Sequence, residues 1–521
     1  MERTASITVL FKDGQTSPPA NTVLKPTHLS DPAALVSLFR QPATQPQAPN
    51  SGPNASLITY QAFRAAFALK RNSPEACLGT PWPAAKFYQA SLPPCMFLLG
   101  LIIVAPLFTL KACALCLSLG FIALSLFRLS ATLSTPLKAS FPARQPDHSL
   151  PKVSLILALY QEANSVEDLI GALKKLDYPD DKVEILLAIE QDDVETLSRA
   201  ALAILKDKRF RLIPIPLIGP RTKPKALNFA YLQSRGDIIA VYDAEDAPHP
   251  QQIRHAAAAF AQNPKLGCVQ APLGWYNAHE NWLTRQFTME YAAHFHVILP
   301  YFSRLGWALP LGGTSNFFRR QALDEVCAWD PFNVTEDADL GFRLVKAGWQ
   351  LDMIAPGTLE EAPLTLEAWL KQRSRWLKGH ALTWRIHVQR NAKGEPMAYK
   401  DQAALHLCLG AGVLSALIHA PTLLAIPTGL VYALLRPQPS ALLLLSVITV
   451  AICGLSHLWI LQTGLKRAQM KVGLWTLLSA FAYWPLQSLA AWRALRELLT
   501  APYLWQKTTH GQSKHNRHAP H

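Results

Sequence analysis

Two long apolar blocks constrain the fold of this chain more than any other feature of its sequence. Apolar residues gather in Cys95–Ala131 and again in Leu405–Trp492, and the residues between these blocks have an ordinary globular composition. A helix needs roughly 17–25 predominantly apolar residues to cross a bilayer, so each block is long enough to supply membrane helices. The sequence therefore predicts a membrane protein with a globular domain held between two groups of transmembrane helices.

The first block is predicted to form a two-helix transmembrane hairpin over residues 91–135. Pro94–Leu110 and Ala112–Ala131 are each about long enough to span the bilayer, and Lys111 marks the expected turn between them. A hairpin leaves both of its ends on one side. Residues 1–90, rich in proline, glutamine, serine and alanine, are therefore expected to form a partly flexible cytoplasmic leader on the side of the globular domain.

The second block predicts C-terminal transmembrane helices over residues 401–500. Leu405–Leu435 contains two prolines and is either one kinked span or two short ones, whereas Ala441–Leu461 is an uninterrupted span. Val472–Leu499 contains a proline of its own and either spans the bilayer or turns back. The number of C-terminal spans is thus open, and residues 501–521 form a short basic tail.

Basic residues beside the apolar segments explain most of the formal net charge of +14. Lys466 and Arg467, for example, follow the predicted span Ala441–Leu461, and such residues favour the cytoplasmic side of a membrane. No zinc-finger spacing or other nucleic-acid-binding motif accompanies this charge, so no nucleic-acid partner is expected.

Residues 145–360 alternate between apolar runs typical of buried strands and segments with helical periodicity. The predicted strands are Val153–Leu159, Val183–Ile189, Arg211–Ile215 and Ile238–Tyr242, and the predicted helices between them are Ser165–Leu176, Glu195–Leu205 and Lys225–Gln233. Such alternation predicts an open, mostly parallel α/β sheet. Ligands of these sheets bind outside the carboxyl ends of the strands, which is where acidic clusters fall in this sequence.

Two acidic clusters each follow a predicted strand. The carboxylates of Glu190–Asp193 are suited to hydrogen bonds from a ribose or a uracil ring, although a solvated turn explains them equally well. The carboxylates of Asp243–Asp246 are suited to a divalent cation that neutralises a diphosphate. A turn without a ligand is the ordinary alternative for this cluster too.

A third acidic group, Thr335–Asp337, contains a candidate general base. A sugar hydroxyl is a poor nucleophile at neutral pH, and a carboxylate within hydrogen-bond reach can accept its proton during attack. Asp339 is the competing candidate for this role. Thr335 is also expected to cap the helix that runs through Leu340–Val345, and capping is compatible with catalysis.

A small basic group lies at a predicted junction between a loop and a helix. It consists of Lys223, Lys225 and Asn228. A lysine at such a junction is well placed to bind phosphate, and a solvated loop is the alternative.

Gln372–Trp376 lies on a long amphipathic segment that is expected to form interface helices within residues 361–400. Arg375 is suited to bidentate binding of a diphosphate, and Trp376 to packing against the apolar face of a sugar. The alternative is that both side chains face lipid headgroups.

The order of these motifs closely resembles that of the processive family-two glycosyltransferases, which include bacterial cellulose synthase, hyaluronan synthase and chitin synthase. The resemblance covers about residues 90–510, and Thr335–Asp337 and Gln372–Trp376 match the family's TED and QxxRW motifs in full. It implies a GT-A catalytic domain, which is a Rossmann-like α/β fold, beside an α-helical transmembrane region. It also implies inverting transfer from a UDP-sugar with Mg²⁺ or Mn²⁺.

The resemblance implies a role for each matching residue. Asp337 is the implied catalytic base. The implied donor-binding residues are Glu190, Asp192, Asp193, Lys225, Asn228, Asp243, Gln372, Arg375 and Trp376. The implied acceptor-binding residues are Gly313, Thr314, Ser315 and Trp376, within and beyond the loop where the family faces its acceptor.

Two departures from the family pattern leave choices open. The family's DxD motif is Asp243-Ala244-Glu245 here and is followed by Asp246, so the metal ligands are Asp243 with either Glu245 or Asp246. The usual Asp-Asp-Gly after the second strand is replaced by Glu190–Asp193, so the uridine contact is open among the acidic residues of that cluster.

The resemblance implies an enzyme in the bacterial inner membrane, with a cytoplasmic catalytic domain, that elongates an exopolysaccharide and couples elongation to translocation. Its expected partners are a UDP-sugar, glucose by default, the growing glycan, the lipid bilayer and export or periplasmic subunits. One alternative is a single-addition transferase with a lipid or glycolipid acceptor. An alternative of another class is a non-catalytic membrane scaffold of a polysaccharide export system.

Overall fold

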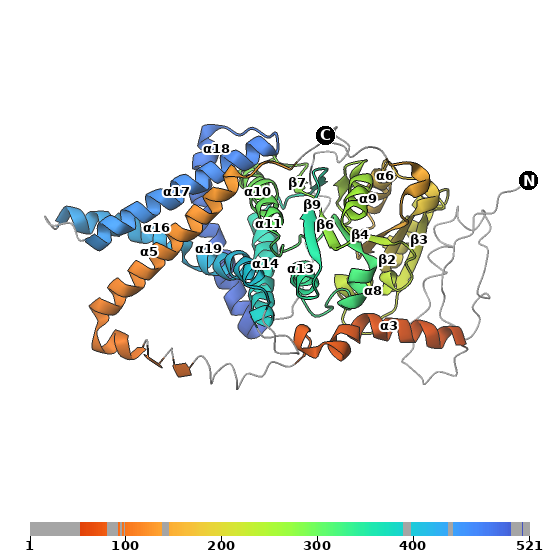
Figure 1. Cartoon of the computed structure of the whole chain (residues 1–521), viewed down its shortest axis with the longest axis horizontal. Helices are drawn as coiled ribbons and strands as arrows, with labels where there is room; N and C mark the ends of the chain where they lie inside the picture. The colour runs from red at the N-terminus through yellow and green to blue at the C-terminus, as the bar shows by residue number, and fades with distance from the viewer. Residues whose placement is uncertain are drawn as a thin grey trace, which may run out of the picture.

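The computed structural model describes residues 53–80, 92–93, 96–97, 99–137, 145–388, 397–435, 441–501 and 513. Most of the predicted leader and of the predicted basic tail lies outside these residues. In Figure 1 the sheet with its flanking helices fills one end of the molecule, and the long helices α5, α16 and α17 extend from the other end.

A seven-stranded sheet forms the centre of the globular domain. Its strands are β1 (Val153–Leu159), β2 (Val183–Glu190), β3 (Phe210–Ile215), β4 (Ile238–Tyr242), β6 (Leu266–Gln270), β8 (Asn316–Arg319) and β9 (Gln350–Met353). They follow the order β3-β2-β1-β4-β8-β6-β9, in which only β8 runs antiparallel to its neighbours. The predicted strands and the mostly parallel α/β fold are therefore confirmed.

Both faces of this sheet are buried, which explains why its strands are continuous apolar runs. Side chains of successive strand residues point to opposite faces. Leu155 and Leu157 of β1 accordingly join one hydrophobic cluster, and Ile156 joins another on the opposite face. The helices that accompany the sheet are α6 (Val166–Leu173), α7 (Val194–Ile204), α8 (Lys223–Tyr231), α9 (Gln252–Gln262), α12 (Arg320–Glu325) and α13 (Glu336–Lys346).

A second, three-stranded sheet connects the globular domain to the helices that follow it. It consists of β5 (Ala247–Pro248), β10 (Thr358–Glu360) and β7 (Leu273–Trp275) in that order. The helices that follow these strands are α10 (Trp282–Ala293), η5 (His294–Ile298), α11 (Leu299–Arg304) and the long α14 (Leu366–Val388). Strand β10 leads directly into α14, so the small sheet sets where that helix begins.

Helix α3 (Pro53–Asn72) of the leader packs against α8 of the catalytic domain. The side-chain amide of Asn228 on α8 donates hydrogen bonds to the carbonyls of Ala65, at 3.0 Å, and Trp329, at 2.8 Å. The described part of the leader is thus built into the domain rather than attached loosely beside it.

The predicted turn at Lys111 is wrong, because α5 (Pro106–Ser130) runs through Lys111 as one helix. The break lies earlier, at Ala105, where φ is −140° and ψ is 64°. A proline disfavours helical geometry in the residue before it, which explains a break ahead of Pro106. A lysine in an apolar run need not end a helix, since its long side chain can carry the charge to water.

Three helices of the described chain are long and apolar enough to cross a membrane: Pro106–Leu133, Tyr399–Leu424 and Leu443–Arg467. The second includes α15 (Tyr399–Leu405), the π-helical turn η6 (His406–Gly410) and the start of α16 (Ala411–Leu435), which is a single helix despite its two prolines. The third lies in α17 (Ala441–Arg467). Beyond them, α18 (Leu474–Leu478) and α19 (Ala480–Thr500) fold back, and α19 packs against α14 and α16.

Candidate active site

A cavity of about 750 Å³ begins at the carboxyl ends of β1, β2 and β4 and continues between the helices of the membrane side. Of the residues predicted from the sequence, it is lined by Glu190, Asp243, Glu245, Gly313, Thr314, Asp337, Gln372, Arg375 and Trp376. Segments far apart in the chain therefore meet around one cavity at the strand ends where α/β proteins bind their ligands.

Lys223 is the lysine of the basic group that reaches the cavity. Its ammonium lies 2.5 Å from a carboxylate oxygen of Asp243 and donates to the carbonyl of Gly313 at 2.8 Å. Burial lowers the pKa of Lys223, but the carboxylates of Asp243 and Glu336 outweigh this effect and hold the pKa above its ordinary value. Lys223 therefore stays positively charged beside the acidic cluster and is suited to bind a phosphate group.

The other two members of that group have structural roles. Lys225 is buried and forms an ion pair with Glu190 at 2.8 Å, and Asn228 bonds to the backbone as described above. Neither residue is among those that line the cavity. The donor-binding role predicted for Lys225 and Asn228 is therefore not supported by their placement. Lys223, at the start of the same helix, lies at the cavity instead.

Glu245 and Asp246 face different surroundings, although they are adjacent. Asp246 is fully buried, and its carboxylate accepts hydrogen bonds from the Asp243 amide, at 2.7 Å, and from the Thr314 hydroxyl. It closes the turn after β4 and is not among the cavity-lining residues, whereas Glu245 is one of them. This placement favours Glu245 over Asp246 as the second metal ligand.

Glu360, at the end of β10, adds a third carboxylate to this side of the cavity. Burial raises the pKa of Glu360 well above its ordinary value, and the charges of Asp246, Glu245 and Asp243 raise it further. Its Oε1 atom is buried and has no hydrogen-bond partner among the described residues. Oxygen donors of this kind fit a hard divalent cation. The described residues contain no preformed group of three or more ligands, so donor phosphates and water would complete the coordination.

Asp337 lies in the first turn of α13, and Thr335 occupies the predicted N-cap position of that helix. One carboxylate oxygen of Asp337 accepts from the amide of Ala338 at 2.7 Å, and the carboxylate lies beside Gly313, where a Cβ atom would come within 3.2 Å of it. Burial raises the pKa of Asp337, and the Ala338 amide, Lys223 and Arg375 only partly offset the rise. A carboxylate with a raised pKa in a cavity is suited to proton transfer.

Asp339, the competing base, has a structural role instead. It is buried and pairs with Arg343 at 2.7 Å and with His387 at 2.8 Å, so that it ties α13 to α14. It is not among the residues that line the cavity.

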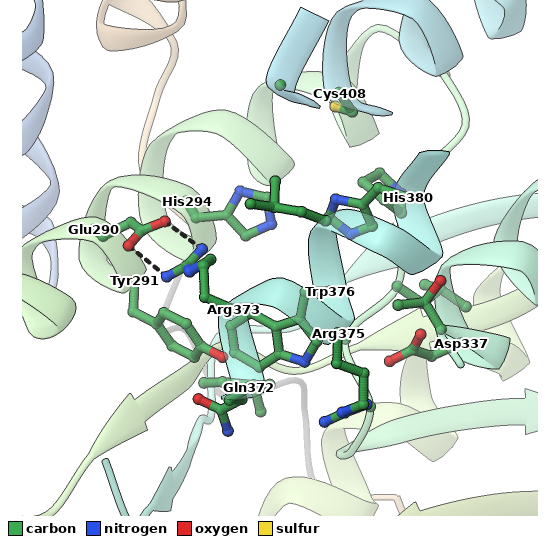
Figure 2. Close-up of a pocket in the computed structure, with 18 of the residues that line it drawn as sticks. Glu290, Tyr291, His294, Asp337, Gln372, Arg373, Arg375, Trp376, His380 and Cys408 are labelled. Carbon is green, nitrogen blue, oxygen red and sulfur yellow. Dashed lines mark hydrogen bonds and ion pairs between the residues drawn. The ribbon is translucent and has the colours of Figure 1, made fainter. Parts of the chain in front are cut away.

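Helix α14 carries the QxxRW residues into the cavity. Arg375 donates one hydrogen bond to the carbonyl of Val334, at 3.1 Å, while its Nε atom has no partner. The side-chain oxygen of Gln372 is likewise buried without a partner. In Figure 2, Arg375 and Asp337 lie to one side of the Trp376 indole. Unpaired polar atoms beside an aromatic ring are expected where a polar ligand binds.

A buried cluster of side chains around Arg373 holds Trp376 in position. The local sequence does not predict this cluster. Arg373 forms a bidentate pair with Glu290 of α10 at 2.8 and 2.6 Å, which Figure 2 draws as dashed lines. Its guanidinium also lies over the rings of Phe287, Trp369 and Trp376, 5.0 to 5.3 Å from their centroids. Glu290 and Arg373 are 83 residues apart, so no periodicity or motif relates them.

The remaining predicted residues do not line the cavity. Asp192 is exposed and pairs with Arg221 at 2.6 Å, and Asp193 caps α7 through the amide of Thr196. The hydroxyl of Ser315 bonds to that of Thr358 at 2.5 Å. Of the three carboxylates in the Glu190–Asp193 cluster, Glu190 is the one that lines the cavity.

Gly379 on α14 allows this helix to approach Thr335, the N-cap residue of α13. A Cβ atom on Gly379 would lie 2.4 Å from the side chain of Thr335. Gly379→Ala should therefore displace the start of α13 and lower sugar transfer by roughly a hundredfold, because small misplacements of reacting groups are costly. Transfer assays in membranes test this, with Gly120→Ala as a control because a Cβ there meets nothing within 4 Å. Equal rates for both variants would contradict it.

Comparison with known proteins relates this site to a family. Residues 238–494 match the family described as "Glycosyl transferase family group 2". The chain is 26% identical over 244 residues to "Probable glycosyltransferase YdaM" of Bacillus subtilis, covering 46% of this chain and 57% of that one. It is 30% identical over 232 residues to "Beta-monoglucosyldiacylglycerol synthase" of Trichormus variabilis, covering 44% of this chain and 49% of that one.

Among solved structures, a mannosyltransferase from Pyrobaculum calidifontis in complex with GDP-Man and Mn²⁺ aligns with a TM-score of 0.46 and 16% sequence identity, over 75% of this chain and 99% of that one. The chain spans about half the length of the two curated relatives above. The match to this family description covers residues 238–494, a range that includes the Asp243–Asp246 cluster, α13 and the QxxRW helix α14.

Proposed function

We propose that this chain is an inverting glycosyltransferase that moves a sugar, glucose by default, from a UDP-sugar to an acceptor in the membrane-side part of the cavity. The observation that carries this proposal is the convergence of Asp337, the Asp243–Lys223 pair and the three QxxRW side chains on one cavity. It supplies a base, a site for a diphosphate and an aromatic surface for a sugar.

Each group has a distinct task in the reaction. A bound Mg²⁺ or Mn²⁺, held by Asp243 and Glu245, would neutralise charge on the diphosphate leaving group. Lys223 and Arg375 bind the same diphosphate from the protein side. Asp337 accepts the proton of the acceptor hydroxyl as its oxygen attacks the anomeric carbon, and the bond to UDP breaks on the opposite face. A single displacement of this kind inverts the anomeric configuration.

Two acceptors are supported by different observations. The complete QxxRW motif supports a growing exopolysaccharide and processive addition. The relatives named as β-monoglucosyldiacylglycerol synthases support a lipid or glycolipid acceptor and a single addition. For both, we place the catalytic domain at the cytoplasmic face of a bacterial inner membrane, because Lys466 and Arg467 end the span in α17 on the side of the domain. Export or periplasmic subunits are further proposed partners of the polymer-forming enzyme.

The proposed function is tested by incorporation of radiolabelled sugar from a panel of UDP-sugars into membranes that contain the protein, with Mg²⁺ or Mn²⁺. A product that stays at the origin of a gel indicates a polymer, and one extracted into organic solvent indicates a glycolipid. Incorporation from no donor by the wild-type protein would contradict the proposal and favour the non-catalytic scaffold.

Substitutions at the turn after β4 distinguish the two candidate metal ligands. We expect Glu245→Gln to weaken Mn²⁺-dependent UDP binding roughly tenfold or more while the protein stays folded. Asp246→Ala should instead lower the free energy of unfolding by about 1–3 kcal/mol, because the Asp243 amide and the Thr314 hydroxyl lose their acceptor. Calorimetric UDP titrations and thermal unfolding measure the two effects. The assignment fails if the two variants exchange these behaviours.

A further inference from the structure

The membrane-side part of the cavity contains an arginine and four histidines. They are Arg128 of α5, His294 of η5, His380 of α14, His419 of α16 and His457 of α17, and we call them the Arg128 cluster. Most belong to helices that are long and apolar enough to span a membrane. Ionisable side chains in such helices are costly to bury and usually serve a function.

Among the residues that the structure describes, no carboxylate forms an ion pair with Arg128. In the part of the chain that the structure describes, no Asp or Glu oxygen lies within 4.0 Å of its guanidinium. Glu290 is the carboxylate that interacts electrostatically with Arg128, but its oxygens already accept from both Arg373 nitrogens, from Tyr483 at 3.0 Å and from Gln487 at 3.3 Å. A positive charge in the cavity is thus left for a ligand to balance.

The neighbouring imidazoles are held in place by Trp484. Its ring stacks on His419 with 5.1 Å between ring centroids, and its indole nitrogen donates to Nε2 of His457 at 3.4 Å. This bond leaves the proton of a neutral His457 on Nδ1, where it is free to be donated. Nδ1 of His419 is buried without a partner. Arg128 interacts electrostatically with His294, His419 and His457, and all four side chains line the same cavity.

We propose that the Arg128 cluster binds the phosphate group of an anionic lipid. A guanidinium with imidazole donors beside it matches the several oxygens of a phosphate, whereas a neutral sugar needs no cation. This inference rests on the proposed function in one respect: the acceptor is taken to bind in the membrane-side part of the cavity.

A lipid fits the position of the cluster better than free phosphate does. Arg128 lies on α5, which packs against α17, whereas His419 lies on α16, which packs against α19. The cluster is thus shared among helices that are long and apolar enough to lie in the bilayer, where a lipid is at hand and free phosphate is scarce. Figure 2 shows His294 and His380 between Cys408 and Trp376, so two imidazoles of the cluster lie next to the QxxRW side chains.

The test is lipid binding by the full-length protein in neutral detergent, measured as thermal stabilisation and by native mass spectrometry. Dioleoyl phosphatidate supplies a lipid phosphate, dioleoylglycerol supplies the same tails without phosphate, and inorganic phosphate supplies the anion alone. We expect phosphatidate to bind and the other two to bind at least tenfold more weakly. Arg128→Gln should weaken phosphatidate binding about ten- to hundredfold, and Arg128→Lys should weaken it less.

Lys466→Gln is the matched control, since it removes an exposed positive charge at the end of another span. It should bind phosphatidate like the wild type, and Arg128→Gln should keep the wild-type unfolding temperature in detergent without lipid, which reports correct folding. Equal phosphatidate binding by wild type and Arg128→Gln would overturn the proposal. Equal binding of dioleoylglycerol or inorganic phosphate by the wild type would overturn it even if Arg128→Gln failed to fold. No donor or sugar transfer enters the assay, so its failure is distinguishable from failure of the proposed function.

Discussion

Asp337→Asn should lower the rate of sugar transfer by about 10²–10⁴-fold, the range that a positioned general base contributes. The substitution keeps the shape of the side chain and the acceptor for the Ala338 amide, so we expect UDP and Mn²⁺ to bind as in the wild type. The measurement is initial-rate incorporation of labelled sugar at saturating donor, together with a UDP titration. Wild-type turnover by the variant would remove Asp337 as the base.

The pH dependence of the wild-type rate gives an independent check on this residue. Burial raises the pKa of Asp337, and only the ionised carboxylate can accept a proton, so the rate should fall as pH drops through that raised pKa. The acid limb is therefore expected above the value of about 3.9 that is typical of an exposed aspartate. The nearby Glu336, whose pKa burial raises to about 7, titrates in the same region, so Glu336→Gln should be profiled alongside.

Asp339→Ala should destabilise the protein rather than act on chemistry. The substitution leaves the guanidinium of Arg343 buried without its ion pair and removes the partner of His387, which costs about 3–5 kcal/mol of unfolding free energy for a broken buried pair. Thermal unfolding of the detergent-solubilised protein measures this loss.

Lys371→Ala is a suitable comparison for Asp339→Ala, because its ion pair with Glu367 is largely exposed and exposed ion pairs add little to stability. A stable Asp339→Ala variant with greatly reduced turnover would reverse the roles assigned to Asp337 and Asp339.

The sequence predicted well those parts of the fold that depend on local pattern. Strand β1 is a continuous apolar run because both of its faces are buried, and its predicted bounds match the structure. Strand β8 (Asn316–Arg319) was not predicted. It is short, and it pairs with β4, which lies more than seventy positions earlier in the chain. The residues near β8 in the sequence therefore do not predict this pairing.

Within the site, the sequence identified the right segments more reliably than the right side chains. Lys223 and Lys225 are two positions apart on one helix, so one faces the cavity and the other faces the buried Glu190. Glu245 and Asp246 differ in the same way, because the turn after β4 directs them apart. Such choices depend on the direction of each side chain, which is set by contacts from distant segments.

The packing of α3 on α8 has a practical consequence for anyone who wishes to isolate the catalytic half. A fragment cut at residue 145 would expose the face of α8 now covered by Ala62 and Ala65 and would strip Asn228 of the Ala65 carbonyl. Helix α8, whose Lys223 lines the pocket, would then lose part of its packing. The smallest unit that keeps this pocket intact begins at the leader helix, so expression boundaries should be drawn before Pro53.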